Sequence, residues 1–131
     1  MKEMSKEIIE EELKIAKKRL ESAKLLFQNN LFEDSINRAY YSIFYAAKAM
    51  LNVLGFDVKT HSGLISEFGL KIVKENLIPP KYGIVLRRAY EMRESSDYAI
   101  GTIFGKEEAE KLLKEASDFL KIAKKFVKER S

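Results

Sequence analysis

Arginine and tyrosine side chains are concentrated in one segment of the sequence, RAYYSIFYAAKAM at residues 38–50. If that segment is a buried helix, the Arg38 guanidinium needs an acidic partner or a phosphate, because an unpaired buried charge is strongly destabilising. Arg38 and the adjacent Tyr41 are therefore candidate phosphate-binding residues. The alternative is that Arg38 pairs with a carboxylate inside the protein and the tyrosines are core residues with satisfied hydroxyls. The residues alone favour that structural interpretation.

The single histidine, His61, lies in a second polar segment, KTHSGL at residues 59–64. The segment precedes an expected helix, and the N–H groups at a helix amino terminus attract anions. Lys59 and His61 could therefore contribute to an anion site. The alternative is that Thr60 or Ser62 caps the helix and that His61 is an ordinary loop residue. Because caps are very common, the local pattern favours this second interpretation.

A third segment, RESSDY at residues 93–98, combines charged side chains with a tyrosine. Arg93 and Asp97 have the i, i+4 spacing that allows an ion pair within one helix. Tyr98, at i+5 from Arg93, projects about 140° away around an ideal helix. Arg93 and Tyr98 can face one cavity only if the helix is distorted or two chains form the cavity. The alternative is a solvated salt-bridge face, the usual environment of such pairs.

Several kinds of chemistry are excluded by what the chain lacks. It has no cysteine and one histidine, so thiol catalysis, disulfides and multi-histidine metal sites are excluded. Neither G-x-x-x-x-G-K-[ST] nor G-x-G-x-x-G occurs, so no glycine-rich phosphate loop is expected. We therefore expect neither a metal nor a cofactor.

The elements that must position these residues are helices. Apolar residues recur in alternating steps of three and four, and no strand-like alternation of useful length occurs. Asn29, Asn30, Gly55, the Pro79–Pro80 pair and Gly105 mark the breaks. The pattern predicts helices over residues 6–28, 32–54, 62–74, 80–103 and 106–129.

These helices should pack as one domain over residues 1–131. The chain is 46% hydrophobic and 34% charged, which suits a globular protein with a single core. The helix over residues 32–54 is apolar on nearly every side, which predicts a place at the centre of the structure or at a subunit interface. Matching alanine and leucine spacing in the first and last helices predicts that they pack closely together. The fold class is all-α.

Charge and hydropathy indicate a cytoplasmic protein. The amino terminus is charged and lacks the apolar stretch of a signal peptide. No apolar run approaches the roughly 20 residues that span a bilayer, so we expect no contact with a membrane. The net charge of +4 is a mild bias that does not by itself establish nucleic-acid binding.

Taken together, the segments resemble the HEPN domains, specifically the small stand-alone prokaryotic kind. The resemblance covers nearly the whole chain, and RAYYSIFYAAKAML is its most specific part. The other matching segments are AKKRLESAKLLF, KTHSGLISEF, RESSDY and EAEKLLKEASDFL. The resemblance implies a four- to five-helix, mostly up-and-down bundle that forms a homodimer.

The resemblance also implies a function. HEPN proteins are often encoded beside a minimal nucleotidyltransferase, with which they form toxin–antitoxin pairs. Many are metal-independent ribonucleases with an R-x-x-x-x-H type motif in a cleft formed across the dimer. Here Tyr98 stands at the position expected for histidine after Arg93. A tyrosine with a pKa of about 10 is a poor general base near neutral pH, whereas an imidazole exchanges protons there.

Three hypotheses follow. The first is a dimeric module that binds a nucleotidyltransferase partner and a nucleotide or RNA phosphate, with little or no RNA cleavage. Its binding residues would be Arg38, Tyr41, Lys59, Arg93 and Asp97. The second is a metal-independent ribonuclease toxin in which Arg93 stabilises the phosphate and His61 or Tyr98 transfers protons. The third is a helical scaffold whose polar groups only stabilise the dimer.

Overall fold

The structure, a computed structural model, describes the backbone of residues 2–98 and 104–131 and the side chains of residues 6–95 and 104–131. The described part of the chain is helical and contains no β-strand, which confirms the all-α prediction. Its elements in chain order are α1 (Lys2–Gln28), α2 (Phe32–Val53), α3 (His61–Phe68), the π-helical turn η1 (Gly69–Val73), α4 (Lys81–Tyr98) and α5 (Lys106–Arg130).

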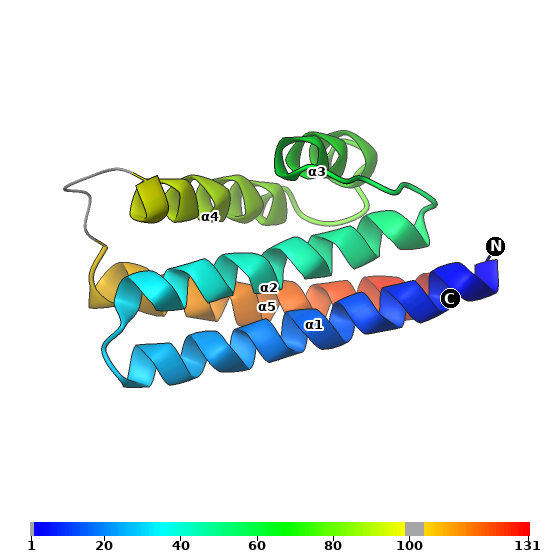
Figure 1. Ribbon diagram of the computed structural model, residues 1–131. Coiled ribbons are helices and arrows are strands. Elements are labelled where there is room, and N and C mark those ends of the chain that lie inside the picture. Colours follow the sequence, from blue (N-terminus) through cyan, green and yellow to red (C-terminus); the bar gives the residue numbers. More distant parts are fainter. Residues whose placement is uncertain (1, 99–103) are drawn as a thin grey trace.

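The four long helices form an up-and-down bundle (Figure 1). α1 and α2 are antiparallel, α4 runs back along α2, and α5 returns toward the end where α1 begins. The short α3 is seen nearly end-on in this view, so it crosses the long helices. α3 and α4 lie on one side of α2, while α1 lies on the other. No helix in the described ranges is long and apolar enough to cross a membrane.

The helix ends follow from local side-chain chemistry, largely as predicted. Asn30 has a φ of 62° and Gly55 a φ of 93°, so both take the left-handed conformation that ends a helix. Thr60 begins α3, since its hydroxyl accepts a hydrogen bond from the Gly63 N–H at 3.0 Å. Gly105 precedes α5, and its N–H donates to the Glu108 carboxylate at 2.9 Å. These residues end or begin helices and keep the connections between them short.

The predicted helix over residues 62–74 is wrong in its second half. The α-helix ends at Phe68 and continues as the π-helical turn η1, in which the Lys74 N–H donates to the Gly69 carbonyl at 2.8 Å. Phe68 and Ile72 remain buried across the wider turn, so the core is still covered. Apolar spacing alone does not separate these two hydrogen-bond patterns.

Other helix limits differ less. α1 begins at Lys2, α2 ends at Val53, and α5 extends to Arg130. The predicted helix over residues 80–103 corresponds to α4, which begins at Lys81, and residues 99–103 lie outside the described part.

α2 occupies the centre of the bundle, as its composition predicts. It contacts α1, α3, α4 and α5. Two of its buried serines donate across to α1, from Ser35 to the Ala23 carbonyl and from Ser42 to the Ala16 carbonyl, each at 2.8 Å. α1 and α5 contact each other, as predicted, and the alanines of the predicted spacing are buried in both helices. The buried core residues of α2 include Ile36, Tyr40, Ile43, Phe44, Ala47, Met50 and Leu51.

Arg38 is exposed to solvent, so the expectation of a buried guanidinium in α2 is wrong. Its side chain lies on the face of α2 that the neighbouring helices leave uncovered. An exposed guanidinium is hydrated and needs neither a buried carboxylate nor a phosphate to be stable.

Candidate functional site

His61, in the first turn of α3, lies against the aromatic face of α2. The Tyr40 hydroxyl is 2.5 Å from His61 Nδ1. The imidazole also stacks on the Phe44 ring, with centroids 4.4 Å apart and an interplanar angle of 27°. Because Thr60 caps α3 immediately before His61, the cap and the two α2 rings together fix the position of the imidazole.

Arg93 of α4 reaches the same face of α2. Its guanidinium carbon lies 5.4 Å from the centroid of the Tyr41 ring and 5.9 Å from that of the Tyr40 ring, within cation–π range. Its Nη1 lies 3.2 Å from a carboxylate oxygen of Glu94. Only 15% of the Arg93 side chain is exposed. The guanidinium charge therefore lies against the Tyr40 and Tyr41 rings and beside the Glu94 carboxylate.

Tyr90, also on α4, contacts His61 and Tyr40. Its ring centroid is 6.1 Å from that of His61 and 5.9 Å from that of Tyr40. Its hydroxyl donates to Glu94 at 3.4 Å. Three helices thus supply one group of residues, here called the Tyr40 cluster: Tyr40, Tyr41, Phe44, His61, Tyr90, Arg93 and Glu94.

The environment of the cluster favours the neutral forms of the His61 imidazole and the Tyr40 phenol. Burial lowers the pKa of His61 below its ordinary value of 6.5, and the nearby positive charges of Arg93 and Lys48 lower it further, while Glu94 opposes them. Burial also raises the pKa of the Tyr40 hydroxyl. Both shifts therefore favour the neutral form of the ring concerned.

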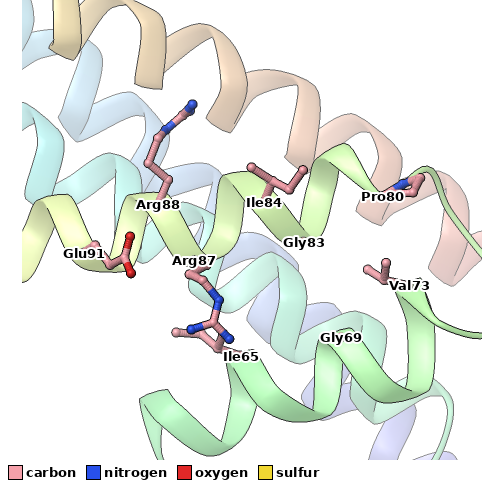
Figure 2. Close-up of a pocket in the computed structure, with 9 residues that line it drawn as sticks. All are labelled: Ile65, Gly69, Val73, Pro80, Gly83, Ile84, Arg87, Arg88 and Glu91. Atoms are coloured by element: carbon pink, nitrogen blue, oxygen red, sulfur yellow. The ribbon is translucent and has the colours of Figure 1, made fainter.

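A separate groove of about 490 Å³ lies between α4 and the α3–η1 segment (Figure 2). It is lined mostly by apolar residues such as Ile65, Val73 and Ile84. Arg87 reaches from α4 toward Ile65, whereas Arg88 points away and pairs with Glu115 of α5. None of the Tyr40 cluster residues lines this groove. Among the described residues no group of three or more metal-ligating side chains is found.

Comparison with known proteins identifies the family. The model of the HEPN domain matches residues 9–126. The chain belongs to the HEPN domain family. A Methanocaldococcus jannaschii protein named "Putative toxin" is 40% identical over 124 residues, which cover 95% of this chain and 92% of that protein. A second protein of that name from the same organism is 32% identical over 119 residues, with coverages of 91% and 81%. An Archaeoglobus fulgidus protein named "UPF0332 protein" is 38% identical over 120 residues, with coverages of 91% and 94%.

In this HEPN chain, the fold brings together three of the residues singled out in the sequence. His61 and Arg93, from different segments, both contact Tyr40, and Tyr41 lies beside them. Lys59 instead forms an exposed ion pair with Asp57 at 3.6 Å. Asp97 and Tyr98 fall outside the residues whose side chains are described, so the predicted Arg93–Asp97 pair stays a prediction.

Five residues that lie at or influence this cluster were given no role from the sequence, namely Tyr40, Phe44, Lys48, Tyr90 and Glu94. A usable signal was present, because Tyr90, Arg93 and Glu94 have the i, i+3, i+4 spacing that places side chains on one helix face. Tyr40 and Phe44 share the same relationship on α2.

Proposed function

We propose that this HEPN protein is a toxin-type module that binds RNA phosphate at Arg93 and His61. The observation that carries the proposal is the placement of both side chains against Tyr40. Arginine binds phosphate through a planar set of N–H donors, and hydrogen bonds to a charged group are stronger than neutral ones. A guanidinium already held by aromatic rings loses little side-chain entropy when an anion binds.

The surroundings of Arg93 fit a nucleic-acid ligand. The positive charge of Lys48, one turn after Phe44 on α2, lowers the pKa of His61, so a second cationic side chain influences this site. Tyr41 and Tyr45 of α2 are half-buried, which leaves part of each ring accessible. Aromatic faces beside cations are the combination that binds single-stranded nucleic acid, because bases stack on the rings while cations contact the phosphates.

The proposal includes partners. Two relatives carry a toxin name, and the family resemblance implies a homodimer paired with a minimal nucleotidyltransferase as antitoxin. Co-expression with the nucleotidyltransferase encoded beside the gene should give a complex that survives size-exclusion chromatography. Light scattering on the protein alone should give the mass of a dimer. A protein that stays monomeric and leaves that partner in a separate peak contradicts this part of the proposal.

The contacts of His61 and Arg93 with the same tyrosine, Tyr40, favour a second candidate function, metal-independent RNA cleavage. In that reaction the 2′-oxygen attacks the adjacent phosphorus while a base removes the 2′-hydroxyl proton. The bond from phosphorus to the 5′-oxygen then breaks, and that oxygen takes up a proton. Arg93 would stabilise the phosphate charge and His61 would be the base.

Incubation of end-labelled single-stranded RNA with the purified protein in EDTA separates the two functions. The binding proposal predicts a shifted, intact RNA in a native gel, with the full-length RNA recovered after denaturation. Cleavage that is lost in Arg93→Ala but kept in Arg87→Ala, which removes the same charge from the same helix, establishes the ribonuclease. RNA that is neither bound nor cleaved refutes both.

A further inference from the structure

The hydrogen bond between Tyr40 and His61 has a defined direction. Tyr40 has no exposed surface, and His61 Nδ1 is its only hydrogen-bond partner among the described residues. The hydroxyl hydrogen of a buried tyrosine must be given to an acceptor, since unsatisfied buried donors are rare. If His61 carried its hydrogen at Nδ1 and donated it to Tyr40, the hydroxyl hydrogen of Tyr40 would have no acceptor. Tyr40 is therefore the donor and His61 Nδ1 the acceptor.

This direction fixes the tautomer of His61. A neutral imidazole carries one N–H, so a ring that accepts at Nδ1 carries its hydrogen at Nε2. The ring is held in the neutral state by its neighbours: it is partly buried, and Arg93 and Lys48 disfavour a positive charge, against the opposing effect of Glu94. The lone pair of His61 is thus directed at Tyr40, and the opposite edge of the ring presents a donor.

The donor at Nε2 is available to a ligand. No hydrogen bond to Nε2 is found among the side chains that the structure describes, and the imidazole is only half-buried. The Arg93 guanidinium, which lies against the same Tyr40 side chain and presents donors and no acceptor, is the cationic group beside which an anion would bind. An anion that contacts Arg93 would therefore meet a second N–H on the imidazole edge.

We propose that Tyr40 is a positioning residue that holds His61 as an Nε2–H donor to the RNA phosphate bound by Arg93, so that His61 does not act as a general base. The identity of the ligand as RNA phosphate rests on the proposed function, whereas the assignment of the His61 tautomer is independent of it. A neutral histidine held by its environment as a hydrogen-bond donor is a known arrangement at sites that bind developing negative charge. It predicts that RNA is bound and left intact.

The tautomer can be measured directly, because the chain contains one histidine and its nitrogen signals need no assignment. Two-bond ¹H–¹⁵N correlation spectra of the full chain near pH 7.5 should show a protonated Nε2 and an unprotonated Nδ1. In Tyr40→Phe, which removes only the hydroxyl, the Nδ1–H tautomer should appear alongside. A protonated Nδ1 in the unmodified protein, or an unchanged tautomer ratio in Tyr40→Phe, overturns the proposal.

The role of the donor is tested by RNA affinity in a pair of His61 variants. His61→Ala should weaken binding of a labelled single-stranded RNA about tenfold, the loss expected for a hydrogen bond to a charged group. His61→Gln places an amide N–H near the position of Nε2 and should recover most of that loss. Equal affinities of His61→Ala and the unmodified protein overturn the donor role, as does His61→Gln binding no better than His61→Ala.

The two tests separate the inference from the proposed function. If the unmodified protein binds no RNA, the proposed function fails while the tautomer is still decided by the nitrogen spectra. If RNA is bound but the spectra show a protonated Nδ1, the proposed function stands and the inference fails. Thermal unfolding followed by circular dichroism checks that each variant is folded.

Discussion

His61 and Arg93 meet at one side chain, that of Tyr40. The Tyr40 hydroxyl lies 2.5 Å from the histidine Nδ1, and the centroid of its ring lies 5.9 Å from the guanidinium carbon of the arginine. The three residues come from α3, α4 and α2, so the site exists only when these helices are packed. A change at any of these contacts should therefore be detectable at the histidine.

The pKa of His61 should lie below 6.5, because burial and the charge of Arg93 both disfavour the imidazolium. A titration of its ring proton signals measures this directly. Arg93→Ala should raise the pKa of His61 and Glu94→Gln should lower it, while Arg87→Ala should leave it unchanged. Opposite shifts in the first two variants would contradict the electrostatic account of the cluster.

The same pKa makes stability depend on pH with a defined sign. Just below pH 6.5, His61 is protonated more fully in the unfolded chain than in the folded protein, because folding lowers its pKa. The free energy of unfolding should therefore fall as the pH is lowered through this range. Urea unfolding at pH 7.5 and pH 5.5 measures the total difference. His61→Gln, which cannot titrate, should show a smaller decrease between these two values.

Glu12 carries a buried carboxylate whose ionisation opposes folding. It is 6% exposed, and the Asn52 amide donates to its two oxygens at 2.8 and 2.9 Å. Burial raises the pKa of Glu12 above 4.5, so its contribution to stability falls as the pH rises above 4.5. The free energy of unfolding of Glu12→Gln, relative to that of the unmodified protein, should therefore increase as the pH rises from 4 to 7, as measured by urea unfolding. A gain that shrinks over this range contradicts the prediction.

The cap of α3 should be sensitive to a single methyl group. A Cβ added at Gly63 would lie 2.6 Å from the Thr60 hydroxyl oxygen and 3.1 Å from a Val58 methyl. Gly63→Ala should break the cap, destabilise the protein by about 1 kcal/mol or more, and shift the His61 signals. Gly69→Ala, where a Cβ meets nothing within 4 Å, is the matched control and should be neutral or slightly stabilising.

The stability of the bundle should come from its core rather than from ion pairs between helices. Phe119 has no exposed surface and contacts the rings of Phe68 and Tyr82. Phe119→Ala should destabilise by about 3–5 kcal/mol in urea unfolding. Arg88→Ala breaks the partly exposed pair with Glu115 and should cost about 1 kcal/mol or less. Comparable losses in the two variants would contradict this ranking.

The helices were predictable because their signals are local. Alternating apolar steps identify the long helices, and Asn30, Gly55 and Thr60 mark ends by side-chain and backbone chemistry that acts within a few residues. The π-helical turn Gly69–Val73 was not predictable, because its hydrogen-bond pattern leaves no mark in apolar spacing. Arg38 was misplaced because a helix that is apolar on nearly every side does not reveal which residues its neighbours leave exposed.

The site was only partly predictable, for a different reason. Arg93 and His61 were singled out by residue type and by the resemblance to HEPN proteins, but their meeting at Tyr40 depends on how α3 and α4 pack on α2. No local pattern encodes such a contact. The direction of the Tyr40–His61 hydrogen bond was also not predictable from the sequence, because it follows from the complete burial of Tyr40.

The binding of RNA phosphate by Arg93 is tested most directly by fluorescence anisotropy of a labelled single-stranded RNA in EDTA. The unmodified protein, Arg93→Ala and Arg87→Ala are compared at several salt concentrations. We expect Arg93→Ala to bind about tenfold more weakly and with a shallower salt dependence, and Arg87→Ala to remain within about threefold of the unmodified protein. No binding by the unmodified protein, or equal losses in the two variants, would contradict the account.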